Sequence, residues 1–168
     1  MLIFAQEREK EVAEKLGPHP LYYIDSLILT TDEFQKFDPN TIARLTILTD
    51  TDATNRFGQA AKDGAIVAET KTFARKHYIS YFRKKSRSYD SVYMAAKNDS
   101  TFQYIINDKV KVNNFEGDLA TIDDWLFISL EILTADDLKN KYQISNKSVG
   151  ILITCKRPQN LFNWNSKF

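Results

Sequence analysis

The single cysteine and the two histidines are the first residues to consider for nucleophilic or acid–base chemistry. A reactive cysteine needs an electropositive, partly exposed environment, whereas Cys155 follows the apolar run 149–154. His19 lies between two prolines and His77 lies in a basic stretch, so neither has a local partner for a catalytic triad. We therefore interpret Cys155 as a buried structural residue and predict no catalytic residues and no enzymatic activity.

The sequence gives equally little support for a metal or a cofactor. The histidines and the cysteine lack the close spacing of zinc ligands. Acidic residues do gather near predicted helix starts, where capping and the helix dipole explain them better than calcium does. They are Asp50, Asp52, Asp123, Asp124, Asp136 and Asp137. Because no twelve-residue calcium loop and no glycine-rich phosphate loop is present, we predict neither a metal nor a cofactor.

A basic and aromatic stretch is the strongest candidate for a binding site. Its cations are Arg75, Lys76, Arg83, Lys84, Lys85 and Arg87. Its interleaved rings are Phe73, Tyr78, Tyr81, Phe82 and Tyr89. Cations can neutralise phosphates while rings stack on bases, and a basic amphipathic helix can lie on an anionic membrane. The preferred alternative is that the rings pack between two parts of the protein while the charges stay solvated.

Composition limits the possible classes of protein. The chain has 168 residues, enough for one domain or two small ones. Its 43% hydrophobic and 27% charged residues are ordinary for a globular protein. A net charge of +1 argues against a generally basic nucleic-acid binder, and one cysteine excludes an internal disulfide. The apolar start MLIFAQ fits either the end of a signal peptide or the start of a helix over residues 7–16.

The two halves of the chain repeat each other. Residues 42–71 return as residues 127–156 at an offset of about 85 residues. Ile47-Leu48-Thr49 returns as Ile132-Leu133-Thr134, and Phe57 returns as Tyr142. The organisation that follows is a first unit over residues 1–74, a basic helical connector over 75–100 and a second unit with a tail over 101–168.

The two units have the same predicted order of elements. The strands are predicted over residues 21–29, 45–48, 65–70, 102–106, 127–133 and 149–154. The first is expected to bend at Asp25-Ser26, with Asn107-Asp108 at the equivalent place. Residues 45–48 and 127–133 show little polar alternation, which predicts strands covered on both faces. Residues 71–97 read as helix broken near residues 86–88, and residues 116–118 read as a loop.

The motifs of the first unit resemble the plug domain of TonB-dependent outer-membrane receptors, especially the Bacteroidetes starch-utilisation type. The matching residues are Pro20-Leu21-Tyr22-Tyr23-Ile24-Asp25, Asp38-Pro39-Asn40, Ile42, Leu45, Ile47, Leu48, Asp50, Ala53, Phe57-Gly58, Asp63-Gly64 and Thr70-Lys71. The second unit matches at fewer positions, which are Ile105-Ile106-Asn107, Ile132-Leu133, Thr154 and Lys156. The sequence departs from the family pattern at Ser26 and Gln143, where glycine is expected.

This resemblance implies a plug fold in tandem, without the receptor's barrel, and a periplasmic or outer-membrane-associated setting. We thus expect an α/β (α+β) fold of two similar β-α-β-α-β plug-like units with small mixed sheets, joined by a basic helical segment. The expected function is non-catalytic binding of another envelope protein. The alternative is a basic surface for anionic lipid or, less favoured, nucleic acid, and an enzyme of unknown type ranks third.

Overall fold

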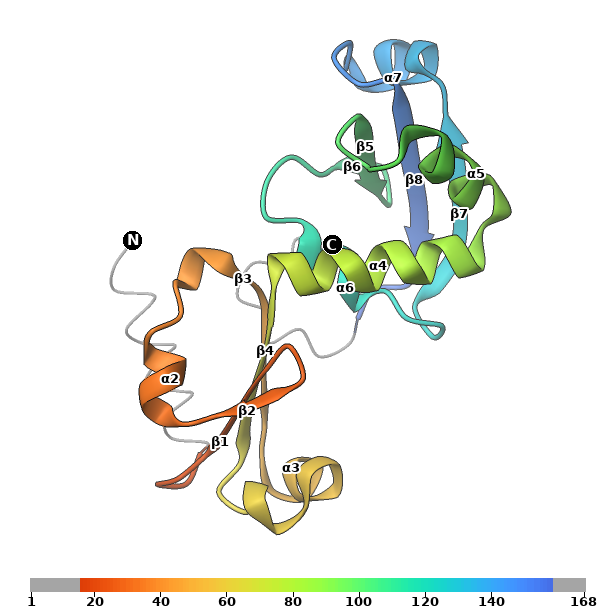
Figure 1. The fold of residues 1–168 in the computed structure, drawn as a ribbon. Coiled ribbons are helices and arrows are strands. Elements are labelled where there is room, and N and C mark those ends of the chain that lie inside the picture. The colour runs from red at the N-terminus through yellow and green to blue at the C-terminus, as the bar shows by residue number, and fades with distance from the viewer. Residues whose placement is uncertain (1–15, 159–168) are drawn as a thin grey trace. The chain divides into compact units, whose positions relative to one another are not determined.

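The computed structural model describes residues 16–158 of the chain (Figure 1). The chain divides into two units, with the boundary between Lys71 and Thr72. The helix predicted over residues 7–16, apart from Leu16, and the tail of the second unit from residue 159 lie outside the described residues.

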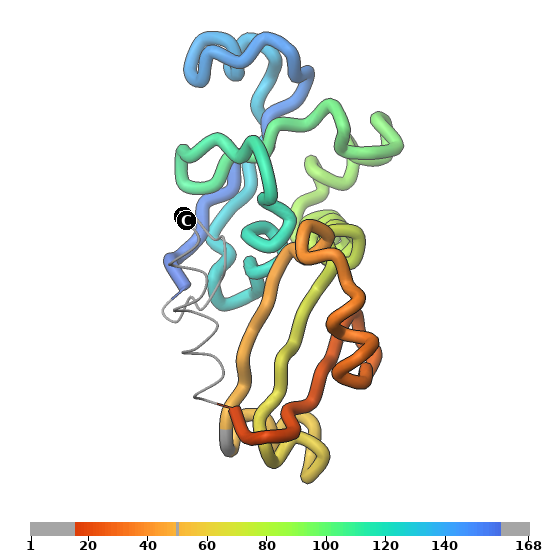
Figure 2. The backbone as a smooth tube through the Cα atoms, turned by 90° about the vertical axis from the view of Figure 1, so that its left-hand side faces the viewer, coloured from red at the N-terminus to blue at the C-terminus, as the bar shows by residue number. Residues whose placement is uncertain are grey.

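A four-stranded mixed sheet forms the first unit. Its strands are β1 (Leu21–Ile24), β2 (Leu27–Leu29), β3 (Ile42–Leu48) and β4 (Ala65–Thr70). They lie in the order β2-β1-β4-β3, with β1 parallel to β4 and the other neighbours antiparallel. Figure 2 shows β1, β4 and β3 side by side in that order.

The second unit has the same topology. Its strands are β5 (Phe102–Ile106), β6 (Lys109–Val110), β7 (Phe127–Leu133) and β8 (Val149–Cys155). Their order is β6-β5-β8-β7, and β5 with β8 is again the parallel pair. The predicted α+β class, with two similar units built on small mixed sheets, is therefore confirmed.

The internal repeat extends to the register of the strands. Leu48 pairs with Ala65 in the first sheet, and Leu133 pairs with Gly150 in the second. Each of these antiparallel pairs also has a register shift near its far end, between Ile42 and Arg44 and between residues 127 and 129. All these positions differ by 85 residues, the offset seen in the sequence.

A two-residue turn of left-handed backbone follows β1 in the first unit and β5 in the second. Asp25 and Ser26 have φ of 48° and 77°, and Asn107 and Asp108 have φ of 47° and 62°. Positive φ at both central residues belongs to the tight hairpin turn that matches strand twist, and Asp and Asn tolerate it better than most residues. The predicted bend is thus a sharp hairpin, which divides the predicted strand 21–29 into β1 and β2.

The first side chain of each turn fixes the hairpin to the neighbouring strand. The Asp25 carboxylate accepts hydrogen bonds from the backbone N–H of Thr70 at 2.8 Å and from its hydroxyl at 2.6 Å. In the second unit, Asn107 Oδ1 accepts from the backbone N–H of Cys155 at 3.0 Å. Thr70 and Cys155 are themselves 85 residues apart, so the repeat conserves this contact with a different side chain.

The described helices connect the strands, and two of them cover the segment predicted as a broken helix over residues 71–97. They are α2 (Thr31–Gln35), α3 (Asp50–Phe57), α4 (Lys71–Lys85), α5 (Arg87–Ala96), α6 (Glu116–Thr121) and α7 (Ala135–Tyr142), with short 3-10 turns at Pro39–Thr41 and Gly58–Ala61. The predicted break between α4 and α5 is confirmed at Ser86, whose hydroxyl accepts from the Tyr89 N–H at 3.2 Å. Gly58 and Gln143 both take positive φ at the ends of α3 and α7, so Gln143 fills the place where glycine was expected.

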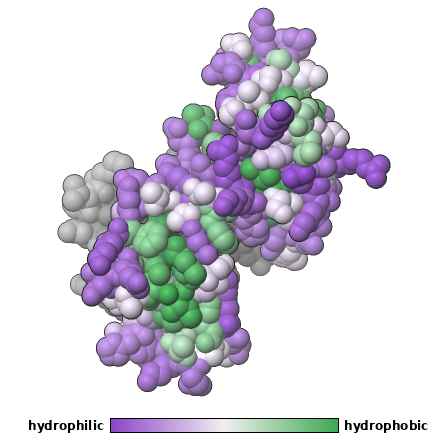
Figure 3. Space-filling view, in the orientation of Figure 1, coloured by the Kyte–Doolittle hydropathy of each residue, from purple (hydrophilic) through white to green (hydrophobic). Residues whose placement is uncertain are grey.

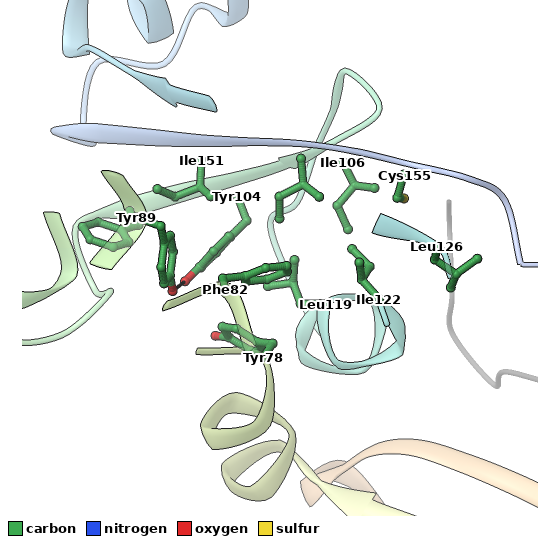
Figure 4. Packing of buried hydrophobic residues seen from close by; sticks show 12 residues of the cluster. Tyr78, Phe82, Tyr89, Tyr104, Ile106, Leu119, Ile122, Leu126, Ile151 and Cys155 are labelled. Atoms are coloured by element: carbon green, nitrogen blue, oxygen red, sulfur yellow. Dashed lines mark hydrogen bonds between the residues drawn. The ribbon is translucent and has the colours of Figure 1, made fainter. Parts of the chain in front are cut away.

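Most of the described core lies in the second unit. Its members, apart from partly buried neighbours, are Tyr78, Phe82, Tyr89, Phe102, Tyr104, Ile106, Leu119, Ile122, Leu126, Ile151, Ile153 and Cys155 (Figure 4). They come from α4, α5 and α6, from strands β5 and β8, and from the residues around α6. Tyr78, Phe82 and Tyr89 of the basic stretch are therefore part of the core of the second unit, and Tyr81 packs against it.

The first unit has a smaller described core and more exposed apolar surface. Ala53, Ala61, Ala65 and Val67 form its buried cluster. A band of hydrophobic residues is visible on the surface of this unit (Figure 3). Leu27 and Ile28 of β2 are more than 60% exposed.

Two local predictions are wrong. Residues 116–118 form the start of α6 instead of a loop, because Gly117, Asp118 and Leu119 are buried in the fold and the acidic first turn complements the helix dipole. The two strands predicted to be covered on both faces, β3 and β7, are edge strands, and every residue of β3 is half-exposed. Their apolar runs therefore do not mark central strands.

Candidate functional site

The helix α4 presents its cations to solvent because its apolar positions are used by the core. Ala74, Tyr78 and Phe82 recur every four residues and are buried. Residues with this spacing lie on one face of a helix. The remaining positions therefore carry the basic side chains outward, and Arg75, Lys76, Arg83 and Lys84 are all exposed.

These four exposed cations line a shallow groove between α4 and α5, called here the basic groove. The groove has a volume of about 610 Å³. Its lining residues are Thr72, Arg75, Lys76, Ile79, Ser80, Arg83, Lys84, Asp90 and Tyr93. Four cations face a single carboxylate there, so the groove is a local positive site on a chain that is nearly neutral as a whole.

The two arginines of the basic groove are held in place by other groups. Arg83 Nε donates to Asp90 Oδ1 at 2.6 Å, and its guanidinium lies 5.4 Å from the centre of the Tyr93 ring. Arg75 forms an ion pair with the buried Asp99. These contacts fix the guanidinium groups and partly neutralise them.

The two lysines of the basic groove are different. Lys76 and Lys84 make no ion pair or hydrogen bond with another residue in the part of the chain that the structure describes. An exposed ammonium without a partner loses little on meeting an anion, since no existing ion pair must be broken. Lys76 and Lys84 are therefore the groove residues best placed to bind an anionic group.

The other two predicted site residues lie outside the basic groove. Lys85 Nζ pairs with Asp124 Oδ1 at 2.8 Å and lies 5.6 Å from the centre of the Tyr81 ring. Arg87 is exposed at the start of α5 and does not line the groove. The structure thus brings together four of the six predicted cations.

The chain matches no family model, no curated protein and no solved structure. Among residues 16–158, no helix is both long and apolar enough to cross a membrane.

The residues first considered for catalysis lie on different elements. His19 and His77 are exposed, one before β1 and one on α4, and Cys155 is buried at the end of β8. Within the described residues, no three His, Cys, Asp or Glu side chains gather as they would to hold a metal. Two of the acidic residues do act as helix or turn caps, because Asp137 completes a capping box with Thr134 and Asp123 accepts from the Leu126 N–H.

The Cys155 thiol is expected to be unreactive in the native protein. Burial raises its pKa above the ordinary value, so less of the nucleophilic thiolate is present at any given pH. We predict that a thiol reagent labels the native chain slowly at neutral pH and fast only after unfolding, with Cys155→Ser costing about 1–3 kcal/mol of stability. Labelling by a chromogenic disulfide reagent, with and without denaturant, measures this. Equal rates in both states would contradict it.

The sequence did not predict a buried hydrogen-bond network that includes Tyr78 of α4. Asp99 Oδ2 accepts from the hydroxyls of Tyr78 and Tyr104, both at 3.0 Å, and the hydroxyls of Tyr104 and Tyr89 lie 2.8 Å apart (Figure 4 shows these two rings meeting). Burial raises the pKa of all three tyrosines above the ordinary value, so they remain protonated. Asp99 sits in a short loop after α5 with no pattern around it, so the sequence carried no signal for its role.

Proposed function

We propose that this chain is a non-catalytic binding module of the bacterial cell envelope, whose second unit binds an acidic segment of another envelope protein in the basic groove. The observation that carries this proposal is a pair of lysines, Lys76 and Lys84, that have no partner among residues 16–158 and lie in a groove already lined by two fixed arginines. The two arginines are already held in place, so binding costs little additional side-chain entropy. The two lysines supply the charge that attracts an anion.

The geometry favours a protein over a lipid surface. A helix that inserts into the membrane interface needs a free apolar face with Trp, Phe or Leu. The apolar face of α4 is occupied, because Tyr78 and Phe82 are at most 1% exposed in the core. The groove itself contributes only the half-buried Ile79 and Tyr93 as larger apolar groups.

Nucleic acid is also less favoured. Sequence-tolerant binding of single strands relies on aromatic rings on which bases can stack. Tyr93 is the one ring among the described lining residues of the groove, and it is stacked on Tyr89 at 19° while Arg83 lies over it. The net charge of +1 also leaves little general attraction for a polyanion.

The envelope setting rests on the resemblance of the motifs to TonB-receptor plugs. Two features support that part of the proposal. The hairpin motif ending in Asp25 and the strand ending at Thr70 are joined by direct hydrogen bonds, and both belong to the matching motifs. The second unit repeats the arrangement through Asn107. On that resemblance we propose a periplasmic or outer-membrane-associated location.

A pair of matched double variants tests the role of the basic groove. Lys76→Gln with Lys84→Gln removes two charges inside the groove, and Lys85→Gln with Arg87→Gln removes two from the same segment outside it. With a fluorescent glutamate-rich peptide at low salt, we expect the first variant to weaken binding by about tenfold, equivalent to about 1.4 kcal/mol, and the second to have a much smaller effect. Binding should also weaken as salt rises, since exposed charges are screened.

The rival functions give different results in the same series. Flotation with vesicles of anionic lipid that depends on Lys76 and Lys84, without peptide binding, would favour the membrane alternative. A mobility shift of single-stranded DNA with the same dependence would favour nucleic acid. Equal peptide binding by both double variants would remove the basic groove from the proposal.

A further inference from the structure

A second pocket, which shares Arg75 with the basic groove, lies at the β5–β6 side of the second unit. In the described part of the chain, the buried polar or charged side chains are Asp99, Gln103, Lys111 and Asp118. Asp99, Gln103 and Lys111 line one pocket of about 250 Å³, and Asp118, outside its lining, pairs with Lys111. We call this the polar pocket. Burying a charged side chain is costly unless it is paired. The gathering of buried polar and charged side chains at this pocket therefore needs an explanation.

The floor of the polar pocket is rigidly built. Lys111 Nζ lies 2.7 Å from Asp118 Oδ2, and both side chains are at most 7% exposed. The Gln103 amide donates to the backbone oxygen of Lys111 at 2.6 Å and to that of Tyr104 at 3.0 Å. The side chains that face a bound molecule are therefore fixed before it arrives, which lowers the cost of binding.

Two further cations lie among the lining residues. Lys147 Nζ donates to the backbone oxygen of Ser100 at 2.7 Å, and an ammonium has three donors in all. Arg75 binds Asp99 on one side, and a guanidinium has five donors. Each cation is thus held by one contact and retains donors for a carboxylate.

One part of the wall is apolar and aromatic. Phe102, Tyr104, Val112 and Phe115 line it, with the rings of Tyr104 and Phe115 5.6 Å apart. The other seven of the eleven described lining residues are polar or charged, so the pocket combines a small apolar surface with polar groups that can orient a ligand. The volume lies just below the range of about 300–1,000 Å³ that suits drug-sized ligands, so it fits a small molecule and excludes a nucleotide or a folded partner.

From these groups we infer that the polar pocket binds a small organic monoanion, a carboxylate with an aromatic or branched apolar body. Among the described residues, Arg75 pairs with Asp99 and Lys111 pairs with Asp118, whereas Lys147 donates to a backbone oxygen. The Lys147 ammonium is therefore the positive charge of the pocket that a single carboxylate can neutralise. The apolar body of the ligand then lies against Phe102 and Phe115.

The first unit shows that the fold does not require such a pocket. It has the same strand topology, yet among its described residues no polar side chain is fully buried. Its second strand is Leu27-Ile28-Leu29, where the second unit has Lys109-Val110 followed by Lys111. A binding role for the second unit alone accounts for this difference between the copies.

Binding of benzoate is the direct test, with benzyl alcohol as the neutral probe of similar shape. Benzoate should give saturable shifts of the amide signals around Phe102, Lys111 and Lys147 in NMR spectra of the full chain, and benzyl alcohol should not. Lys147→Gln should weaken benzoate by about tenfold, equivalent to about 1.4 kcal/mol. Lys141→Gln, a lysine outside the pocket that pairs with Asp108, should leave binding unchanged.

Several outcomes would overturn the inference. They are the absence of saturable benzoate shifts, equal binding of benzyl alcohol, and equal weakening by Lys147→Gln and Lys141→Gln. Thermal unfolding of both variants shows whether they are folded, and Lys147→Arg, which keeps the charge, should retain most of the binding. Because Lys147 does not line the basic groove, failure here would leave the proposed binding of an acidic partner intact.

Discussion

Phe82→Ala is expected to lower the free energy of unfolding of the second unit by about 3–5 kcal/mol, the cost of truncating a buried phenylalanine. The Phe82 side chain is completely buried. Its ring lies 5.5 Å from that of Tyr81 and 5.8 Å from that of Tyr89, both edge-on, and 6.4 Å from that of Phe127. Since these rings come from α4, α5 and β7, the resulting cavity would loosen three elements at once.

Denaturant unfolding combined with hydrogen exchange measures this effect. The amides of α4, α5, β5 and β8 should lose protection in the variant, because all four elements contribute to the same core cluster. Met94→Ala is the control: Met94 is 60% exposed on α5, and surface substitutions usually change stability by no more than about 0.5 kcal/mol. A loss below about 1 kcal/mol for Phe82→Ala would show that the ring is not part of a tightly packed core.

The sequence predicted the repeat and most elements because these depend on local patterns. The turn residues Asp25-Ser26 and Asn107-Asp108, the break at Ser86 and the 85-residue offset are all local or periodic signals. The edge positions of β3 and β7 were missed for the opposite reason. An apolar run looks the same in a central strand and at an edge, and only the pairing order distinguishes them.

The sequence predicted only some of the binding residues, because local patterns do not show how side chains meet in the folded chain. Charge clustering identified the cations of α4, but it could not show that Lys85 turns to Asp124 while Lys76 and Lys84 remain in the groove. The polar pocket was missed altogether. Its members come from α4, from the loop after α5, from β5, from the residue after β6 and from the loop after α7, so only the folded chain brings them together.

Asp99→Ala is expected to cost about 2–4 kcal/mol, because removing one member of a buried polar network leaves the others without partners. The Asp99 side chain is 3% exposed. Without it, the Tyr78 hydroxyl loses the one acceptor that it has among the described residues, and Arg75 loses its counter-ion. The Arg75 side chain is 47% exposed and can turn to water, and the Tyr104 hydroxyl keeps that of Tyr89 as a partner. The buried Tyr78 hydroxyl therefore accounts for most of the cost.

A double-mutant cycle separates the network from simple loss of packing. Combining Asp99→Ala with Tyr78→Phe should cost less than the two single changes added together, because the phenylalanine no longer carries an unpaired buried hydroxyl. Asp124→Ala is the control, since Asp124 also pairs with a cation but is 75% exposed, and an exposed pair contributes about 0.2–1 kcal/mol. If Asp99→Ala costs no more than Asp124→Ala in denaturant unfolding, the buried tyrosine hydroxyls do not depend on Asp99 for the stability of the second unit.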